Sequence, residues 1–290
     1  MKNTTLFRSY VESPGLLPVP GVGDALSARL VQKAGFKAVF LSGYAASASL
    51  LGAPDVGLLT MTEMADCARH IADAVEIPVF ADGDTGHGNA INVMRTMRQF
   101  EKAGVAAIFF EDQVTPKRCG HMSGKQVIPA EEMVAKVRAA VDARVDRDLI
   151  VMARTDALSV NGIGDAIERM HRYIEAGADM AFVESPHSVE QMRRITREIQ
   201  APNMANMVAG GKTPLLSVQE LEQLGFSVAA YPVLMAYAMA HAAERALEYL
   251  QSRETIAGFE ATLDFGAFNQ LIGLEELRAK ESTLYRESGS

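Results

Sequence analysis

Four short apolar stretches of the chain each run directly into acidic or polar residues. The stretches are FADGDTG (80–86), IFFEDQ (108–113), VMARTD (151–156) and AFVES (181–185). Apolar strands that end in functional side chains are what a (β/α)8 barrel needs, because its active site is built from the loops at the carboxyl ends of the strands. The pattern therefore predicts one site at which these strand ends converge.

Four carboxylates are expected at this site, and they would repel one another strongly if the site were dry. A hard divalent cation would offset the repulsion, and an all-oxygen shell that keeps several waters is typical of Mg²⁺, with Mn²⁺ as a substitute. In the other interpretation, the aspartates of DGDTG only form turns and cap the next helix. The predicted metal-site residues are Asp84, Asp82, Asp55 and Glu111.

Cys119 lies among cations in the segment KRCGH (117–121). Lys117, Arg118 and His121 are expected to lower the pKa of its thiol, which would make Cys119 a usable acid, base or nucleophile. An incidental loop cysteine is the other interpretation. A zinc site with His121 is disfavoured, because no further Cys or His has ligand-like spacing. Cys67, in the helical stretch ADCARHIADAV, is expected in the core.

Arg154 ends a predicted buried strand, and a buried arginine needs an anion. A substrate carboxylate would serve, as would an internal ion pair with Glu184 or Asp156. The loop at 42–44 offers backbone N–H groups that could hold an oxyanion. Together with Arg154, the predicted substrate-binding residues are Ser42, Gly43, Tyr44, Glu184 and Asn206.

The elements that must position these residues form a recurring unit, in which a helix ends, a glycine follows and a strand begins. The glycine stands where a helix C-cap favours a left-handed residue. Four such units are KAGFKAVFLSG (33–43), KAGVAAIFFED (102–112), EAGADMAFVES (175–185) and QLGFSVAAYP (223–232). Four further strands are predicted at 17–21, 77–82, 149–154 and 202–207.

Eight near-continuously apolar strands that alternate with helices favour an α/β fold with a closed parallel sheet. We expect a (β/α)8 TIM-type barrel over residues 1–250, followed by a C-terminal helical extension over 251–290 that packs on a neighbouring subunit. The segment 89–104 illustrates the helices. Asn89 is its predicted N-cap, and its apolar face is predicted to contain Ile91, Met94, Met97 and Phe100.

Composition excludes several functions for this chain of 290 residues. Its net charge is −8 and it has no run of lysine or arginine, so no nucleic-acid partner is expected. The longest apolar run, 228–240, contains Pro232 and is too short to span a bilayer, so no membrane partner is expected. Two cysteines and an N-terminus without a signal-peptide core favour a cytoplasmic location.

These motifs together resemble the isocitrate lyase/phosphoenolpyruvate mutase superfamily over nearly the whole chain. The matching pieces are SGYAASASLLGAPDVG (42–57), ADGDTGHGN (81–89), EDQVTPKRCGH (111–121), ARTDA (153–157), VESP (183–186) and NMVAGGKTP (206–214). KRCGH after EDQ is similar to the signature of the carbon–carbon lyase branch, in which the cysteine is the catalytic acid/base. The phosphonate-forming mutases lack that cysteine.

The resemblance implies Mg²⁺-dependent cleavage of a 2-hydroxy dicarboxylate to a 2-oxo acid, pyruvate or glyoxylate, and a carboxylate. An alkylmalate such as 2,3-dimethylmalate, or a methylisocitrate-like di- or tricarboxylate, is the expected substrate. Asp84 would be the direct metal ligand, and Cys119 would protonate the leaving carboxylate. Lys117, Arg118 and His121 would stabilise the developing charge. An oxaloacetate hydrolase or decarboxylase is the alternative, and a phosphoenolpyruvate or carboxyphosphonoenolpyruvate mutase is disfavoured by Cys119.

Departures from the family pattern bear on the substrate. Methylisocitrate lyases resemble KRCGHR followed by PN, whereas here His121 is followed by MSGK, which argues against a tricarboxylate. Relatives usually carry glutamate where this chain has Ala209, so its pocket is expected to be larger or more neutral. The resemblance also implies a gating loop at 117–125 and a homotetramer that exchanges C-terminal helices.

Overall fold

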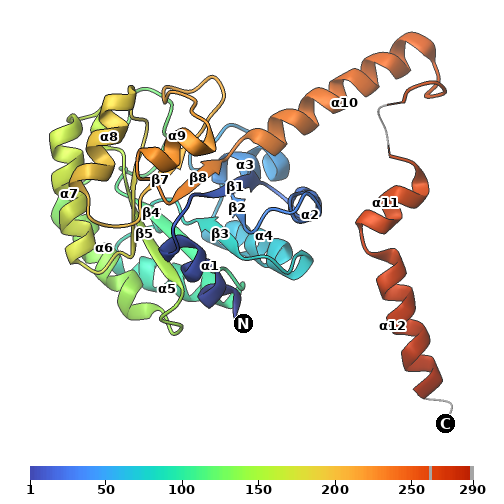
Figure 1. The fold of residues 1–290 in the computed structure, drawn as a ribbon, viewed down its shortest axis with the longest axis horizontal. Helices are drawn as coiled ribbons and strands as arrows, with labels where there is room; N and C mark the ends of the chain where they lie inside the picture. The colour runs from blue at the N-terminus through green and yellow to red at the C-terminus, as the bar shows by residue number, and fades with distance from the viewer. Residues whose placement is uncertain (261–262, 288–290) are drawn as a thin grey trace.

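The structure, a computed structural model, describes residues 1–260 and 263–287, in which strands and helices alternate along the chain (Figure 1). The strands are β1 (Leu17–Val22), β2 (Val39–Leu41), β3 (Val79–Asp82), β4 (Ala107–Glu111), β5 (Ile150–Thr155), β6 (Met180–Val183), β7 (Met204–Asn206) and β8 (Val228–Tyr231). The helices within and before the barrel are α1 (Asn3–Glu12), α2 (Ala25–Lys33), α3 (Gly43–Leu51), α4 (Met61–Ala74), α5 (Ala90–Lys102), α6 (Ala130–Ala143), α7 (Ile163–Glu175), α8 (Val189–Glu198) and α9 (Val218–Gln223). A short 3₁₀ helix spans Ala157–Ser159, and α10 (Leu234–Arg253), α11 (Phe265–Leu271) and α12 (Leu274–Glu287) follow the last strand.

The strands form one parallel sheet that closes on itself. Their order is β6-β5-β4-β3-β2-β1-β8-β7, so the first strand pairs with the last. A parallel bridge between Ala181 of β6 and Asn203, just before β7, joins the two remaining edges. The predicted (β/α)8 TIM-type barrel is therefore confirmed.

The glycines of the predicted recurring unit stand where helices end. All four have a positive φ, between +85° and +108°, which an L side chain rarely adopts. Each one directly follows the capping residue of α2, α5, α7 or α9, and a strand begins within a few residues. The four positions are Gly35, Gly104, Gly177 and Gly225.

Helix α5 confirms one prediction and corrects another. Asn89 is its N-cap, since the side chain accepts hydrogen bonds from the backbone N–H of Ile91 and Asn92. The predicted apolar face is wrong at Ile91, which is 71% exposed, whereas Val93 is buried. At about 100° per residue, Ile91 lies roughly 200° from Val93 and so faces solvent.

A chain of aromatic rings fills the barrel interior and is closed at one end by α1. Phe7 of α1 stacks on Phe80 with a centroid distance of 6.1 Å, and Phe80 stacks on Phe40 at 4.8 Å. Phe109 lies 5.7 Å from both Phe80 and Phe182. Helix α1 therefore plugs the N-terminal end of the barrel, and the rings form a floor for the opposite end. A separate, larger core lies between the strands and the surrounding helices and contains Cys67, as predicted.

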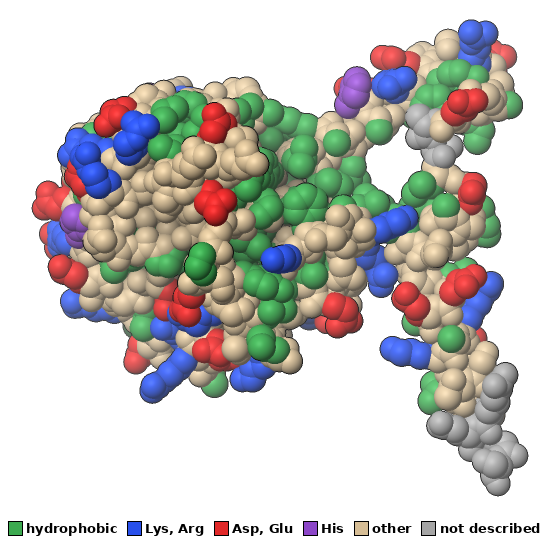
Figure 2. Space-filling model, in the orientation of Figure 1, with side chains coloured by type: hydrophobic (Ala, Val, Ile, Leu, Met, Phe, Trp, Pro, Cys, Tyr) green, Lys and Arg blue, Asp and Glu red, His purple; other side chains and the backbone are tan. Residues whose placement is uncertain are grey.

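The C-terminal elements leave the barrel (Figure 1). Helix α10 projects away from β8 with no buried residue, and it continues through residue 250 to Arg253. The chain then returns as α11, where Arg29 of α2 donates a hydrogen bond to the carbonyl of Leu271. Figure 2 shows hydrophobic side chains at the surface of this extension. Its packing on a neighbouring subunit and the division into 1–250 and 251–290 stay predictions, and residues 261–262 and 288–290 lie outside the described residues.

Among the helices of the described ranges, none is both long enough and apolar enough to cross a membrane.

Candidate active site

The alternation of side chains along each strand places a polar layer above the aromatic floor. Within the barrel, interior residues occur at every second position of a strand. The interior positions are occupied by Phe40, Phe80, Phe109, Met152, Phe182 and Met204. Two residues further along, at the carboxyl end of each strand, come Ser42, Asp82, Glu111, Arg154, Glu184 and Asn206. Six of the predicted site residues therefore share one layer because of the strand period alone.

A cavity of about 200 Å³ opens above this layer. Phe40, Phe109 and Phe182 form its floor. Nine predicted site residues line it, namely Ser42, Tyr44, Asp55, Asp82, Cys119, His121, Arg154, Glu184 and Asn206. Gly43, Asp84, Glu111 and Lys117 are buried beside it, whereas Arg118 is exposed. The side chain of Arg118 turns outward and donates to the carbonyl of Ser123, so the structure does not bring it to the cavity.

Lys117 reaches into the predicted carboxylate cluster. Its Nζ lies 2.6 Å from Oδ1 of Asp55 and 2.8 Å from Oδ1 of Asp84, and all three side chains are buried. Burial lowers the pKa of the ammonium, but the carboxylates of Asp84 and Asp55 outweigh it, and the pKa of Lys117 is raised well above its ordinary value. Lys117 is therefore a fixed positive charge in this cluster.

Asp82 and Glu111 are the cluster carboxylates whose pKa is raised by burial. Burial, followed by the neighbouring Asp84, raises the pKa of Asp82 to about 7. Burial also raises the pKa of Glu111 well above its ordinary value, although Arg154 opposes this shift. Both carboxylate oxygens of Glu111 are buried without a hydrogen-bond partner. Such groups are stabilised by an added positive charge or by ordered water.

These carboxylates fit the predicted magnesium ion, but not as a ready-made cage. Within 1–260 and 263–287, no three His, Cys, Asp or Glu side chains are gathered closely enough to hold a metal unaided. The carboxylate oxygens of Glu111, which have no hydrogen-bond donor, instead suit a cation that keeps several water ligands, as Mg²⁺ does.

Arg154 lies over the aromatic floor, with its Cζ 5.1 Å from the ring centroid of Phe182. Its guanidinium contacts Asp156 at 2.9 Å, Glu111 at 3.3 Å and Glu184 at 3.4 Å. Both internal ion pairs considered from the sequence are therefore present, together with a third. These partners orient the guanidinium toward the cavity that it lines.

The expectation that cations lower the pKa of Cys119 is wrong. Burial raises the pKa of this thiol, and the backbone N–H of His121 opposes the shift only in part. The cause is spatial, since Lys117 is paired with carboxylates and Arg118 points away. Cys119 is consequently a neutral thiol at neutral pH, which is the form that donates a proton.

His121, Glu184 and Asn206 form a hydrogen-bonding wall. Nδ1 of His121 accepts from the backbone N–H of Lys212 at 3.0 Å, which places the proton of the neutral ring on Nε2, 3.3 Å from Glu184. Burial lowers the pKa of His121 and favours this neutral form. Asn206 donates to Glu184 at 3.0 Å, and its own Oδ1 is buried and unpartnered. That oxygen is free to accept a hydrogen bond from a substrate hydroxyl.

The predicted oxyanion loop is largely occupied by the protein itself. The backbone N–H of Gly43 donates to Asp82 at 3.2 Å, and that of Ser42 donates to the carbonyl of Val22. A Cβ at Gly43 would lie 2.7 Å from Oδ2 of Asp82, so this approach requires glycine. The hydroxyl of Ser42 caps α3.

The cavity also contains residues that were not predicted from the sequence, among them Tyr237, Met122 and Val208. Tyr237 of α10 meets Tyr44 edge-on with ring centroids 6.2 Å apart, and its hydrogen bond is the main cause that raises the pKa of Tyr44 to about 12. Met122 and Val208 line the same cavity. Tyr237 lies in the apolar run at 228–240, but nothing in that run identified Tyr237 as a pocket residue.

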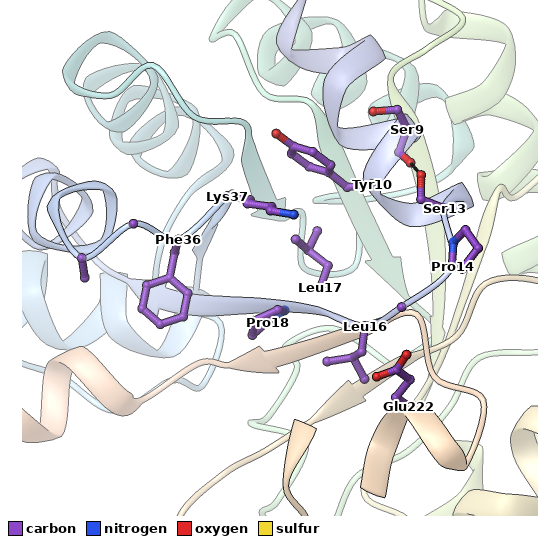
Figure 3. A pocket seen from close by; sticks show the side chains of 13 residues that line it. Ser9, Tyr10, Ser13, Pro14, Leu16, Leu17, Pro18, Phe36, Lys37 and Glu222 are labelled. Carbon is purple, nitrogen blue, oxygen red and sulfur yellow. Dashed lines mark hydrogen bonds between the residues drawn. The ribbon is translucent and has the colours of Figure 1, made fainter. Parts of the chain in front are cut away.

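A second hollow, of about 790 Å³, lies at the other end of β1 (Figure 3). Its lining comes from the end of α1, the start of β1 and the segment before β2, and includes Tyr10, Phe36, Lys37 and Glu222. Lys37 lies over the ring of Tyr10 at 5.4 Å. The lining of this second hollow contains none of the predicted catalytic residues, so the volume of a hollow does not by itself identify the active site.

Comparison with known proteins gives a family for this geometry. The model of the phosphoenolpyruvate phosphomutase family matches residues 7–251. The chain belongs to the phosphoenolpyruvate mutase/isocitrate lyase superfamily. The resemblance identified from the sequence motifs is therefore confirmed.

Three relatives of this superfamily member match along almost all of its length. The 2,3-dimethylmalate lyase of Eubacterium barkeri is 49% identical, covering 97% of this chain and 98% of the relative. The chloroplastic carboxyvinyl-carboxyphosphonate phosphorylmutase of Arabidopsis thaliana is 45% identical over 99% and 87%. The petal death protein of Dianthus caryophyllus is 43% identical over 97% and 89%.

Solved structures of superfamily members share the fold. A 2,3-dimethylmalate lyase has a TM-score of 0.92 at 36% identity, covering 98% of this chain and 96% of the other. An oxaloacetate acetylhydrolase bound to 3,3-difluorooxalacetate has a TM-score of 0.93 at 32% identity, over 98% and 97%. A phosphonopyruvate hydrolase in complex with oxalate and Mg²⁺ has a TM-score of 0.88 at 29% identity, over 97% and 99%.

Proposed function

We propose that this chain is a carbon–carbon lyase that cleaves a 2-hydroxy dicarboxylate of the alkylmalate type into a 2-oxo acid and a carboxylate. The similarity to 2,3-dimethylmalate lyase supports this reaction class. The observation that carries the proposal is the neutral thiol of Cys119, which lines the same cavity as the Arg154 guanidinium and the unpartnered oxygen of Asn206. The thiol can donate a proton, the guanidinium can bind a substrate carboxylate, and the Asn206 oxygen can accept a hydrogen bond from a substrate hydroxyl.

In the proposed reaction, the substrate loses the proton of its 2-hydroxyl to a base of the carboxylate cluster. The C2–O bond becomes a carbonyl while the C2–C3 bond breaks, and its electron pair passes to C3 and the adjoining carboxylate. Cys119 delivers its proton to C3, which completes the carboxylate product. Arg154 binds a carboxylate throughout, and Asn206 orients the hydroxyl. Lys117 and the neutral His121 stabilise the charge that develops.

We infer that Mg²⁺, or Mn²⁺ in its place, is the cofactor, held by Asp84 directly and by Asp82, Asp55 and Glu111 through water. When bound, the ion would polarise the oxygens of the 2-oxo acid portion of the substrate. The raised pKa values of Asp82 and Glu111 and the unpartnered oxygens of Glu111 support this assignment. The Mg²⁺-containing structure of a superfamily member supports it independently.

The wall of the cavity supports a substrate with alkyl groups. The apolar residues Met122, Val208, Ala209 and Val233 line the cavity. Ala209 stands where glutamate would place a further negative charge beside the dicarboxylate. We therefore propose that the enzyme accepts bulkier 3-alkyl groups than 2,3-dimethylmalate carries.

A second candidate is oxaloacetate hydrolysis, which the similarity to oxaloacetate acetylhydrolase favours. It would use the same carboxylate cluster and Arg154 but would have no need of the apolar wall. A mutase function is supported by the similarity to the Arabidopsis mutase and is opposed by the placement of Cys119 in the cavity.

We propose further that the chain forms a homotetramer in which the C-terminal helices pack on a neighbouring subunit. The exposed apolar side chains of the extension support this, because Phe265 is 88% exposed and α10 has no buried residue. Two unpaired cysteines are consistent with the proposed cytoplasmic location.

The test is product formation from a panel of diacids, first with Mg²⁺ and then with EDTA. The panel contains 2,3-dimethylmalate, a 3-ethyl analogue, 2-methylisocitrate, malate, oxaloacetate and phosphonopyruvate. Metal-dependent release of pyruvate or glyoxylate from a hydroxy diacid is the expected result. Turnover of oxaloacetate alone would replace the lyase by the hydrolase, and turnover of phosphonopyruvate alone would overturn both.

A further inference from the structure

Lys125 is a buried lysine at the far end of the segment that carries Cys119. Only 2% of its side chain is exposed. Its ammonium donates to Oδ1 of Asp156 at 2.6 Å and to the backbone carbonyl of Gly120. The side chain therefore runs beneath its own loop and connects the loop to the end of β5.

Gly120 is the point at which the loop is held. It stands between Cys119 and His121, and its carbonyl accepts a second hydrogen bond from Oγ of Ser185 at 3.0 Å. A Cβ built on Gly120 would lie 2.5 Å from Cγ of Glu184 and 2.6 Å from Nη2 of Arg154. The turn thus lies against Glu184 and Arg154 of the polar layer so closely that only glycine fits.

Asp156 gives Lys125 a rigid partner. Its carboxylate is fully buried and also accepts from Nε of Arg154 at 2.9 Å. Its backbone N–H donates to Asp112 at 2.9 Å. Although burial alone would raise the pKa of Asp156, Arg154 and Lys125 hold it at about 2, so the carboxylate stays ionised. The carboxylate that accepts a hydrogen bond from Lys125 therefore also binds Arg154.

A buried ammonium with two charge-assisted hydrogen bonds differs from a surface ion pair. Its hydrogen bonds are short and strong, and removal of the cation leaves an uncompensated buried carboxylate. The other two cations near the turn do not have this role, since Lys117 pairs with Asp55 and Arg118 faces solvent. Of the basic side chains described in 117–125, Lys125 is the one joined to the Gly120 carbonyl.

We propose that Lys125 is a positioning residue that holds the Cys119–Gly120–His121 turn over the cavity through the Gly120 carbonyl and Asp156. The loop that carries the acid and the substrate-binding arginine are thereby joined to one carboxylate, that of Asp156. The benefit for catalysis rests on the proposed role of Cys119. The placement of the turn by Lys125 is independent of that role.

The test measures how fast iodoacetamide alkylates each cysteine in Lys125→Met, by mass spectrometry of the native protein. Cys119 reports the turn, and Cys67, on the buried face of α4, reports global unfolding. Rates are compared at the plateau of their pH profiles, so that a change in thiol pKa does not enter. We expect Cys119 to react at least about fivefold faster, the equivalent of about 1 kcal/mol in local opening, with Cys67 unchanged. We also expect kcat to fall about tenfold or more on the substrate identified by the panel.

Lys136→Met is the matched control, because Lys136 is equally buried and donates to a backbone carbonyl, that of Thr85, outside this loop. It should leave Cys119 alkylation unchanged. Ser185→Ala removes the other hydrogen-bond donor to the Gly120 carbonyl and should also increase the rate of Cys119 alkylation. This second variant keeps the test decisive if Lys125→Met does not fold. An unchanged Cys119 rate in folded Lys125→Met, an unchanged rate in Ser185→Ala where Lys125→Met does not fold, or a parallel rise at Cys67 would overturn the proposal. Because labelling needs no substrate, it is independent of whether the lyase assignment holds.

Discussion

The ammonium of Lys117 lies 2.8 Å from Oδ1 of Asp84, inside the carboxylate cluster proposed to hold Mg²⁺. One cation of the protein thus already offsets part of the negative charge there. The remaining charge, on Asp82 and Glu111, is what an added ion would neutralise.

The first prediction concerns this compensation. Lys117→Met removes the fixed cation, so the metal-free protein should lose several degrees in melting temperature. Mg²⁺ should restore more stability to the variant than to the wild type, because ligand binding stabilises the folded state by mass action. Melting curves with EDTA and with Mg²⁺ measure both effects. Equal Mg²⁺ stabilisation of the two proteins would show that Lys117 and the ion do not share a site.

The second prediction is a pH dependence of stability. Burial raises the pKa of Asp82 from 3.8 to about 7, so between these values the folded state binds more protons than the unfolded state. Stability of the metal-free protein should therefore fall as pH rises through this window. Asp82→Asn should flatten the fall in urea unfolding followed between pH 5 and pH 8 in EDTA. Asp73→Asn, at an exposed position of α4, is the control, and an equal slope in wild type and Asp82→Asn would contradict the argument.

The third prediction tests the proton donor. Cys119→Ser replaces a thiol with a far weaker acid, and loss of a general acid typically costs about 10²–10⁴ in rate. We expect kcat to fall by that order while calorimetric binding of Mg²⁺ and oxalate stays largely intact. Cys67→Ser, in the core away from the cavity, should keep its turnover. Parallel loss of binding and turnover in Cys119→Ser would indicate a structural role.

The fourth prediction concerns substrate choice. Ala209→Glu adds a carboxylate to the apolar wall, which should disfavour larger 3-alkyl groups. We expect kcat/KM for a 3-ethyl substrate to fall at least about tenfold relative to the 3-methyl substrate, a discrimination within what a pocket achieves. Ala209→Gln, of similar size but neutral, separates bulk from charge. An unchanged ratio in both variants would exclude Ala209 as a determinant.

The fifth prediction addresses assembly. Phe265→Asp places a charge at the exposed start of α11, and it should leave a monomer unaffected but weaken an interface. We expect light scattering to show a tetramer for the wild type and smaller species for the variant. Lys280→Asp, elsewhere on the extension, is the control. A wild-type monomer at micromolar concentration would disprove the proposed tetramer.

Much of the fold was predictable because it depends on short-range rules. The glycine that follows a helix and the alternation of side chains along a strand both depend on residues close in sequence. The alternation predicts that residues such as Asp82, Glu111 and Arg154 lie in one layer. The plug formed by Phe7 was not predicted, because its contact with Phe80 joins distant parts of the chain.

The loop residues show where prediction from neighbours fails. Lys117 and Arg118 are adjacent in sequence, yet one is buried among carboxylates and the other faces solvent. The backbone path of an irregular loop decides such directions, and no periodicity reports it. For the same reason the pKa of Cys119 is raised rather than lowered, because charges close in sequence were not the charges close in space.

The pairing of β1 with β8 imposes an order on biosynthesis. Leu17 is in register with Val228, more than two hundred residues later. One edge of β1 therefore stays unpaired until β8 has left the ribosome. Until then, that edge exposes backbone groups ready to pair with any other strand. The nascent chain therefore depends on its own final quarter to protect its beginning.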